Sequence, residues 1–124
     1  MGNINSVVIS GNLVADCEKA KAGETPLITF TIASNEYRRN SQTGESDSYA
    51  NFIECTMFGK RVTSLARYLV KGTKLTVFGH LRQQRWENDG GKHSKLGLIV
   101  EEVEIFLPKK ESDDLKHEQL DIPW

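Results

Sequence analysis

The fold of this chain is decided by residues 51–86, NFIECTMFGKRVTSLARYLVKGTKLTVFGHLRQQRW, where the spacing of the apolar side chains changes twice. Residues 51–58 alternate between apolar and other side chains, as a half-buried strand does. Residues 60–70 then place apolar side chains three and four positions apart and end before a Lys-Gly pair, which predicts a short amphipathic helix. Residues 73–86 alternate again. The stretch therefore predicts a strand, a helix and a second strand.

Two further strands are predicted before this stretch. Residues 4–13 are rich in β-branched side chains and reach a Gly-Asn turn signal, and residues 27–34 alternate cleanly. Between these strands and residue 51, residues 36–50 (EYRRNSQTGESDSYA) are polar throughout, with Gly44 at the expected turn. We interpret them as a long loop, and a loop of this length in a small domain is more often functional than decorative.

A last strand follows the stretch and completes the predicted fold. Residues 87–95 contain Asp-Gly-Gly and are expected to form the loop of a hairpin. Residues 96–106 alternate until Glu101 and Glu102 shift the phase, as a β-bulge does, while Gly79 is a natural bend point in the preceding strand. This order predicts an all-β OB-fold, a five-stranded Greek-key barrel with one short helix between its third and fourth strands.

The composition is that of a small soluble domain. The chain has 124 residues, of which 38% are hydrophobic and 27% charged. No apolar run approaches the ~20 residues of a membrane span, and the N-terminal residues carry no signal or transit pattern, so we expect a cytoplasmic, nucleoid-associated protein without a membrane partner. Cys17 and Cys55 form no metal or redox motif and are expected to be packed thiols.

Net charge alone does not indicate the partner. The formal net charge is −1, but the segment from Lys109 onward holds three lysines and five acids, which leaves 13 basic and 12 acidic residues in the body. A body this close to neutral is not a strongly basic domain. The positions of the basic side chains therefore decide what the domain binds.

Aromatic and basic side chains interleave at positions predicted to point outward. They are Tyr37, Arg38 and Arg39 in the loop, Phe52 and Phe58 on the third strand, Lys74, Arg82 and Trp86 on the fourth strand, and Arg85 and Lys92 on the hairpin. Single-stranded nucleic acid needs both kinds: each unpaired base can stack on an aromatic ring, for about 1–3 kcal/mol per base, and its phosphates seek nearby cations. Stacking tolerates any base, so little sequence preference is expected. The alternative for the two phenylalanines is packing under a loop or a neighbouring subunit.

Other functional classes find less support in the sequence. The only predicted helix uses its apolar face on the core, so the chain offers no helix sized for the major groove of duplex DNA. His80, His93 and His117 lack the spacing of a metal site or a catalytic triad, and no glycine-rich phosphate loop follows a strand. We therefore expect a protein that is not an enzyme and needs no metal or cofactor.

Three groups of motifs, in order and at family spacing, make the chain closely resemble the bacterial single-stranded DNA-binding proteins, which are built on an OB-fold. The motifs are NSVVISGNL at residues 5–13, FGK at residues 58–60, and the run from Lys71-Gly72 through Gly79-His80-Leu81-Arg82 to Trp86. The resemblance covers residues 4–106 and then the last four residues. Each motif is weak alone, and their order and spacing carry the resemblance.

The resemblance implies specific roles for individual side chains. It implies base stacking by Tyr37, Phe52, Phe58 and Trp86, and phosphate contacts by Lys60, Lys71 and Arg85 with Arg38 or Arg39. The first two stacking positions are often tryptophan in the family, so weaker stacking of the same character is expected there. The resemblance also implies a homotetramer that serves DNA replication, recombination and repair.

The resemblance divides the chain into an OB domain at residues 1–107 and a tail at residues 108–124. Residues 108–121 contain two large apolar side chains, Leu115 and Leu120, too little to offset the entropy of ordering, so a disordered tail is predicted. The tail leads to Asp121, Ile122, Pro123 and Trp124, an apolar tip that suits docking into a basic-rimmed pocket of a replication or repair protein. The alternative is a frayed end.

The tail departs from the family pattern. Family tips usually end in phenylalanine after a dense acidic run, and a long linker often precedes them, whereas this tail is short and carries Trp124. A shortened chain of this kind also resembles paralogues specialised for DNA uptake. Two further hypotheses stay open: an OB-fold adaptor of a replication or DNA-uptake assembly that binds mainly protein, and a binder of single-stranded RNA.

Overall fold

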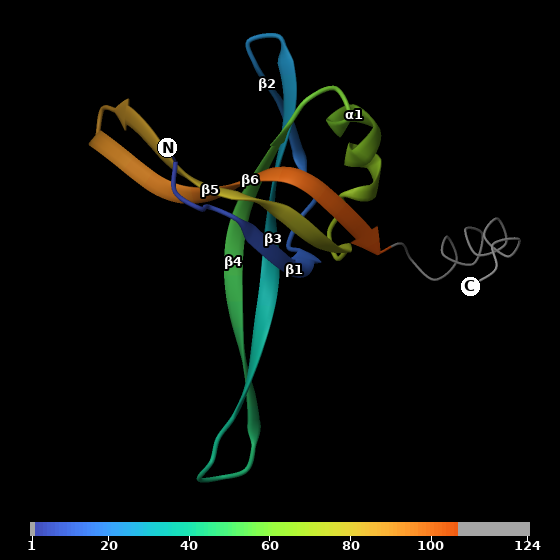
Figure 1. The fold of residues 1–124 in the computed structure, drawn as a ribbon, viewed down its shortest axis with the longest axis vertical. Coiled ribbons are helices and arrows are strands. Elements are labelled where there is room, and N and C mark those ends of the chain that lie inside the picture. Colours follow the sequence, from blue (N-terminus) through green and yellow to red (C-terminus); the bar gives the residue numbers. More distant parts are fainter. Residues whose placement is uncertain (1, 107–124) are drawn as a thin grey trace, which may run out of the picture.

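Six strands and one short helical segment make up the computed structural model, which describes residues 2–106 (Figure 1). The strands are β1 (Val7–Leu13), β2 (Glu18–Ala22), β3 (Thr25–Arg39), β4 (Ser46–Phe58), β5 (Lys74–Asn88) and β6 (Gly91–Phe106). Between β4 and β5 lie the helix α1 (Val62–Leu65) and a 3-10 turn at Ala66–Tyr68. The tail predicted at residues 108–124 lies outside the described residues.

Five of these strands close into a barrel. The hydrogen-bonded order is β1-β5-β6-β4-β3, and β1 pairs with β3 at Asn12↔Ala33 to complete the ring. The β4–β6 pair is parallel, as at Cys55↔Leu98, and the other pairs are antiparallel. This pairing confirms the predicted all-β OB-fold with its short helix between the third and fourth barrel strands. β2 pairs with β3 alone and lies outside the ring.

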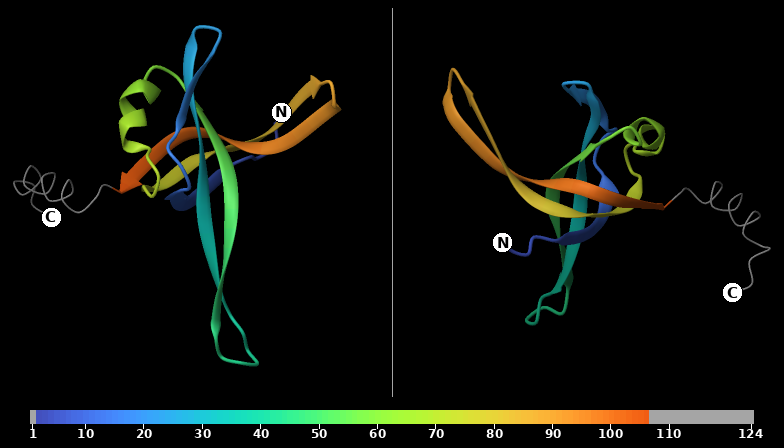
Figure 2. Two further views of the ribbon diagram at one scale, coloured as in Figure 1. Left: turned by 180° about the vertical axis from the view of Figure 1, so that it is seen from behind. Right: turned by 45° about the horizontal axis from the view of Figure 1, so that its top comes forward.

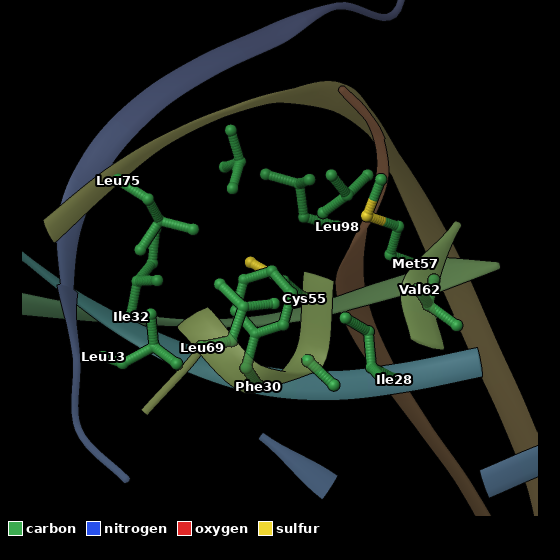
Figure 3. Packing of buried hydrophobic residues seen from close by; sticks show 13 residues of the cluster. Leu13, Ile28, Phe30, Ile32, Cys55, Met57, Val62, Leu69, Leu75 and Leu98 are labelled. Carbon is green, nitrogen blue, oxygen red and sulfur yellow. The ribbon is translucent and has the colours of Figure 1, made fainter. Parts of the chain in front are cut away.

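The core fills the barrel with side chains from alternate strand positions (Figure 3). Ile28, Phe30 and Ile32 of β3 point inward, and Cys55 and Met57 of β4 meet them. The cluster also takes in Leu75, Val77, Leu98 and Val100 from β5 and β6, and Val62, Ala66 and Leu69 from the helical segment. The predicted inward faces of these strands are confirmed within the barrel, but Leu81 and Leu96, which were also expected to face inward, are exposed because β5 and β6 leave the barrel there.

Both cysteines are free thiols, as predicted. Cys55 is buried in the core, and this burial, with a smaller contribution from the Glu54 carboxylate, raises the pKa of its thiol to about 12. Burial also raises the pKa of Cys17, whose Sγ lies 3.6 Å from the carbonyl oxygen of Ala66. Both side chains are thus protonated near neutral pH and serve packing.

The bulge predicted in the last strand is present. The β5–β6 register shifts between Phe78 and Gly79, whose partners are Glu102 and Val100, so Glu101 is the extra residue. Gly79 lies against β6 at this point: a Cβ on Gly79 would come within 2.0 Å of the Ile99 carbonyl oxygen. The bend point predicted at Gly79 is therefore a close backbone approach at the bulge.

The long loop predicted at residues 36–50 is wrong, because both flanking strands continue through it. β3 and β4 stay paired from Leu27↔Phe58 out to Arg39↔Ser46, and this hairpin projects from the barrel (Figures 1 and 2). The turn is held by Asn40, whose carbonyl oxygen accepts a hydrogen bond from the Gly44 N–H at 2.7 Å, with Gly44 at φ +75°. We call residues 35–50 the β3–β4 arm. Having no core to face, the arm shows no apolar alternation.

The second hairpin is also longer than predicted. β5 runs to Asn88 and β6 begins at Gly91, so the loop expected at residues 87–95 shrinks to a turn at residues 89–90. We call residues 82–95 the β5–β6 arm, which projects from another side of the barrel (Figure 2). The strand β2 was not predicted, since all its side chains are exposed and no alternation marks it.

Candidate nucleic-acid interface

The outward face of β4 carries the two phenylalanines singled out in the sequence. Because Ile53 and Met57 point toward the core, Phe52 and Phe58 point outward, and they are 67% and 38% exposed. Both rings thus keep part of their surface accessible within residues 2–106, so neither is fully packed beneath other described residues. The strand therefore presents two accessible aromatic rings about 20 Å apart along its length, at ~3.3 Å per residue.

A polar groove of about 340 Å³ lies beside this face, and we call it the barrel groove. Its polar lining comes from Asp16 and Glu18, from Thr29 and Thr31 of β3, from Glu54 and Thr56 of β4, and from Gln84 and Lys95 of the β5–β6 arm. The Lys95 ammonium nitrogen and a Glu54 carboxylate oxygen meet across it at 2.7 Å. The groove thus runs between the segment that leads into β2 and the base of the β5–β6 arm.

Trp86 stands on the β5–β6 arm directly across from His93. The two rings stack with centroids 5.4 Å apart and planes 22° apart, and the His93 ring is held by Asn88, with 3.0 Å between Nε2 and Oδ1. Lys95 Nζ lies 5.7 Å from the centroid of the Trp86 ring. Trp86 remains 43% exposed and lines a second hollow of about 450 Å³ with Arg85, Lys92 and their neighbours. The arm therefore offers a braced aromatic ring with the Lys95 ammonium group close to it.

The β3–β4 arm presents a further aromatic side chain with cations beside it. Tyr37 pairs with Ser48 across the arm and is exposed. By strand alternation, Tyr37 and Arg39 share the side of the ladder that carries Phe52, and Arg38 faces the other side. The arm thus continues the aromatic face of β4 away from the barrel.

The predicted cations divide between those near the groove and those away from it. Two predicted cations are close to residues that line the barrel groove. Arg82 lies two positions before the groove residue Gln84, on the same side of β5. The backbone N–H of Lys71 donates a hydrogen bond to the carboxylate of the groove residue Asp16 at 2.8 Å. Lys60 follows Phe58 at the end of β4 and is exposed. By alternation, Arg85 and Lys92 occupy the arm face opposite Trp86.

Lys74 is a predicted cation that lies far from Trp86 along β5. It begins β5, which Trp86 nearly ends, and its Nζ lies 5.8 Å from the ring centroid of Phe106. At ~3.3 Å per residue the two positions are separated by up to about 40 Å of strand. The structure therefore does not bring Lys74 to the barrel groove or to the β5–β6 arm.

Three residues of this surface were missed in the sequence. Lys95 and His93 fell inside the predicted hairpin loop, and Tyr49 fell inside the predicted loop at residues 36–50. Only the cross-strand register reveals that Lys95 lies opposite Gln84 and that Tyr49 is an exposed aromatic on the other face of the β3–β4 arm. The only sequence signal for these residues was an alternation of polar and aromatic side chains. That signal is weak in the arms, because neither side of their strands faces a core.

Two other kinds of site are not found in the described part of the chain. Within residues 2–106, no three histidine, cysteine or acidic side chains gather in a way that could hold a metal ion. No helix in that range is long and apolar enough to cross a membrane.

The sequence of this chain is similar to those of known proteins. The sequence model described as the single-strand binding protein family matches residues 4–106. The single-stranded DNA-binding protein of Borreliella burgdorferi is 36% identical over 109 residues, which cover 86% of this chain and 72% of the relative. The single-stranded DNA-binding protein of Aquifex aeolicus is 32% identical over 122 residues, which cover 97% and 82%.

A solved structure shares the fold. The structure described as the Plasmodium falciparum SSB complex with ssDNA superposes with a TM-score of 0.74 over 86% of this chain and 98% of that chain. The two sequences are 18% identical in this alignment, so this likeness concerns the barrel architecture.

Proposed function

This chain belongs to the single-strand binding protein family, and we propose that it binds and protects single-stranded DNA with little dependence on base sequence. The observation that carries the proposal is the set of exposed aromatic rings on β4 and the two arms, with Lys95 at the barrel groove and further exposed cations on the arms. Such a surface stacks bases and neutralises phosphates without reading base edges.

The aromatic rings supply the sequence-independent part of the proposed affinity. Phe52, Phe58 and Trp86 come from two different strands, and Tyr37 extends the face along the β3–β4 arm. Each base stacked on such a ring contributes about 1–3 kcal/mol, so a few stacked bases suffice for tight binding. Spread over the barrel and its arms, these rings favour a strand that wraps around the molecule.

Duplex DNA fits this surface poorly. The helix α1 spans four residues, and its Val62 is buried in the core. A four-residue helix is about 6 Å long, too short to lie in a major groove that admits a recognition helix. The β-structured faces with separate aromatic rings instead favour unpaired bases.

The proposed binding should depend steeply on salt. We expect oligo-dT to quench the fluorescence of Trp86, because a stacked base replaces water on the indole face, and the Trp124→Phe variant removes the background of the second tryptophan. If four phosphates are neutralised, affinity falls about 50-fold between 50 and 200 mM salt, from a slope of about −0.7 per phosphate contact. A flat titration at low salt would contradict the proposal.

We also propose that the chain assembles as a homotetramer. In support, the outward face of β1, β5 and β6 exposes Val8 and Phe106, with Phe78 partly exposed between them. Apolar side chains gathered on one face of a small domain are typical of a contact between subunits. The same oligo-dT titration, set against the solution mass, gives chains per complex, and a mass near the 14.0 kDa of one chain would contradict the tetramer.

The last part of the proposal concerns partner proteins in replication, recombination and repair. Its support lies in the sequence of residues 121–124, where Ile122, Pro123 and Trp124 follow an acidic residue. These residues lie outside the described part of the chain.

Deleting residues 121–124 is expected to abolish pull-down of replication and repair enzymes. Affinity for oligo-dT should stay unchanged or rise, because acids of the tail compete with DNA for the basic face. Pull-down from a bacterial extract and oligo-dT titration of the same variant measure the two effects. Loss of DNA binding with retained partners would contradict the assignment.

A further inference from the structure

The ion pair between Lys95 and Glu54 joins the two parts of the proposed DNA-binding surface. Lys95 Nζ lies 2.7 Å from Glu54 Oε2 on β4 and 5.7 Å from the centroid of the Trp86 ring on the β5–β6 arm. Both side chains of the pair remain partly exposed, at 44% and 57%. Lys95 thus sits at the rim between the barrel groove and the braced tryptophan.

The charges around the groove make Lys95 unusual. The groove is lined by three acids, Asp16, Glu18 and Glu54, and Lys95 is its only lysine or arginine among the described residues. The Asp16 carboxylate already accepts the N–H of Lys71, whereas Glu54 has Lys95 as its ion-pair partner. Phosphates are repelled by the acids inside the groove, so a strand that stacks on Trp86 has to carry its backbone past the groove at Lys95.

The Glu54 carboxylate resembles a phosphate to Lys95. Both are anions that accept charge-assisted hydrogen bonds from an ammonium group at about 2.7–2.9 Å. An exposed lysine–carboxylate pair of this kind contributes little to stability, so exchanging one anion for the other costs little. The pair can therefore open when a phosphate arrives.

We propose that Lys95 is a phosphate subsite for single-stranded DNA, and that Glu54 occupies it in the DNA-free protein as an internal competitor. The inference rests on the proposed function, since it takes the ligand to be the phosphodiester backbone. On binding, the Lys95 ammonium leaves Glu54 and contacts the phosphate beside the base that stacks on Trp86. Glu54 thereby lowers the affinity of the whole face and sets how much salt the complex tolerates.

The test compares Glu54→Gln with a charge-matched control. Glu102→Gln also removes one exposed acid from an ion pair, that with Arg61 at 3.2 Å, but Glu102 does not line the groove. Binding is measured by the fluorescence anisotropy of labelled oligo-dT across a salt series. Glu54→Gln is expected to bind about two- to fivefold more tightly at low salt, the range given by exposed ion pairs, and Glu102→Gln is expected to bind like the unmodified protein.

The double variant Glu54→Gln/Lys95→Gln tests whether a DNA phosphate replaces the Glu54 carboxylate at Lys95. Because it loses one negative and one positive charge, it keeps the net charge of the unmodified protein, so a change in binding cannot come from net charge alone. If Lys95 contacts a phosphate, the slope of log affinity against log salt becomes shallower by about 0.7 in the double variant. An unchanged slope means that the pair stays closed on DNA and overturns the inference, as does a Glu54→Gln variant no tighter than Glu102→Gln. Absent or salt-independent binding by the unmodified protein would instead overturn the proposed function itself. Thermal melts confirm that each variant is folded.

Discussion

Replacing Trp86 by alanine is expected to weaken the binding of oligo-dT by about 5- to 150-fold, the loss that corresponds to one stacked base. The indole is 43% exposed, stacked against His93 at 5.4 Å and approached by Lys95, so it is held in place and still accessible. A braced ring loses little side-chain entropy when a base stacks on it, which places its contribution toward the upper part of that range. Anisotropy of labelled oligo-dT at fixed salt measures the change.

The control for this experiment is Trp86→Phe, which keeps an aromatic face at the same position. It should recover most of the affinity lost in Trp86→Ala, because stacking requires a π-face more than an indole. The salt slope should stay the same in both variants, since no cation is removed. Binding by Trp86→Ala within twofold of the unmodified protein would show that the β5–β6 arm does not stack a base.

Replacing Gly79 by alanine is expected to lower the free energy of unfolding by about 3 kcal/mol or more. A Cβ at this position would lie 2.0 Å from the Ile99 carbonyl oxygen and 2.9 Å from a methyl carbon of Leu98. The obstacle is backbone of the paired strand at the β-bulge, so relief requires β5 and β6 to separate. Urea unfolding followed by circular dichroism measures the loss, which is a large part of the 5–15 kcal/mol that stabilises a typical domain.

Gly97→Ala provides the matched control on β6. Its Cβ would lie 3.2 Å from Nε2 of Gln84, the far end of a flexible side chain that can move aside. We expect a loss below about 1 kcal/mol for this variant. Equal losses for Gly79→Ala and Gly97→Ala would contradict a steric cause specific to the bulge.

The elements that face the core could be predicted from the sequence. Residues such as Ile28, Ile53 and Leu75 recur at spacings that only a strand buries, and the change of spacing around Val62 marks the helix. The phase shift at Glu101 marks the bulge for the same reason, since the inward set resumes one position later. These signals exist because burial constrains every second position of a strand.

The two arms could not be predicted in their true extent. Residues 40–45 are the turn, and the strands around them are polar because the arm faces solvent on both sides. No apolar alternation survives there, so the residues resembled a loop. The strand β2 escaped prediction for the same reason, with every side chain exposed.

The candidate interface also has a part that the sequence predicts and a part that it does not. Phe52 and Phe58 were predicted to point outward because they alternate with core residues of β4, and Trp86 because it continues the outward phase of β5; the exposure of all three agrees. The ion pair of Lys95 with Glu54 and the stacking of His93 on Trp86 join residues far apart in the chain or across a hairpin turn. Neither follows from spacing along a single strand.

The sequence by itself determined the all-β barrel, its helix, its bulge and the outward position of Phe52 and Phe58, because local alternation records which side of each strand is buried. Only the tertiary structure decided the length of the arms and the meeting of Lys95 with Glu54 at the groove. These features depend on the register between strands and on barrel closure, which hydrogen bonds between distant segments set and the order of residues along one strand does not express.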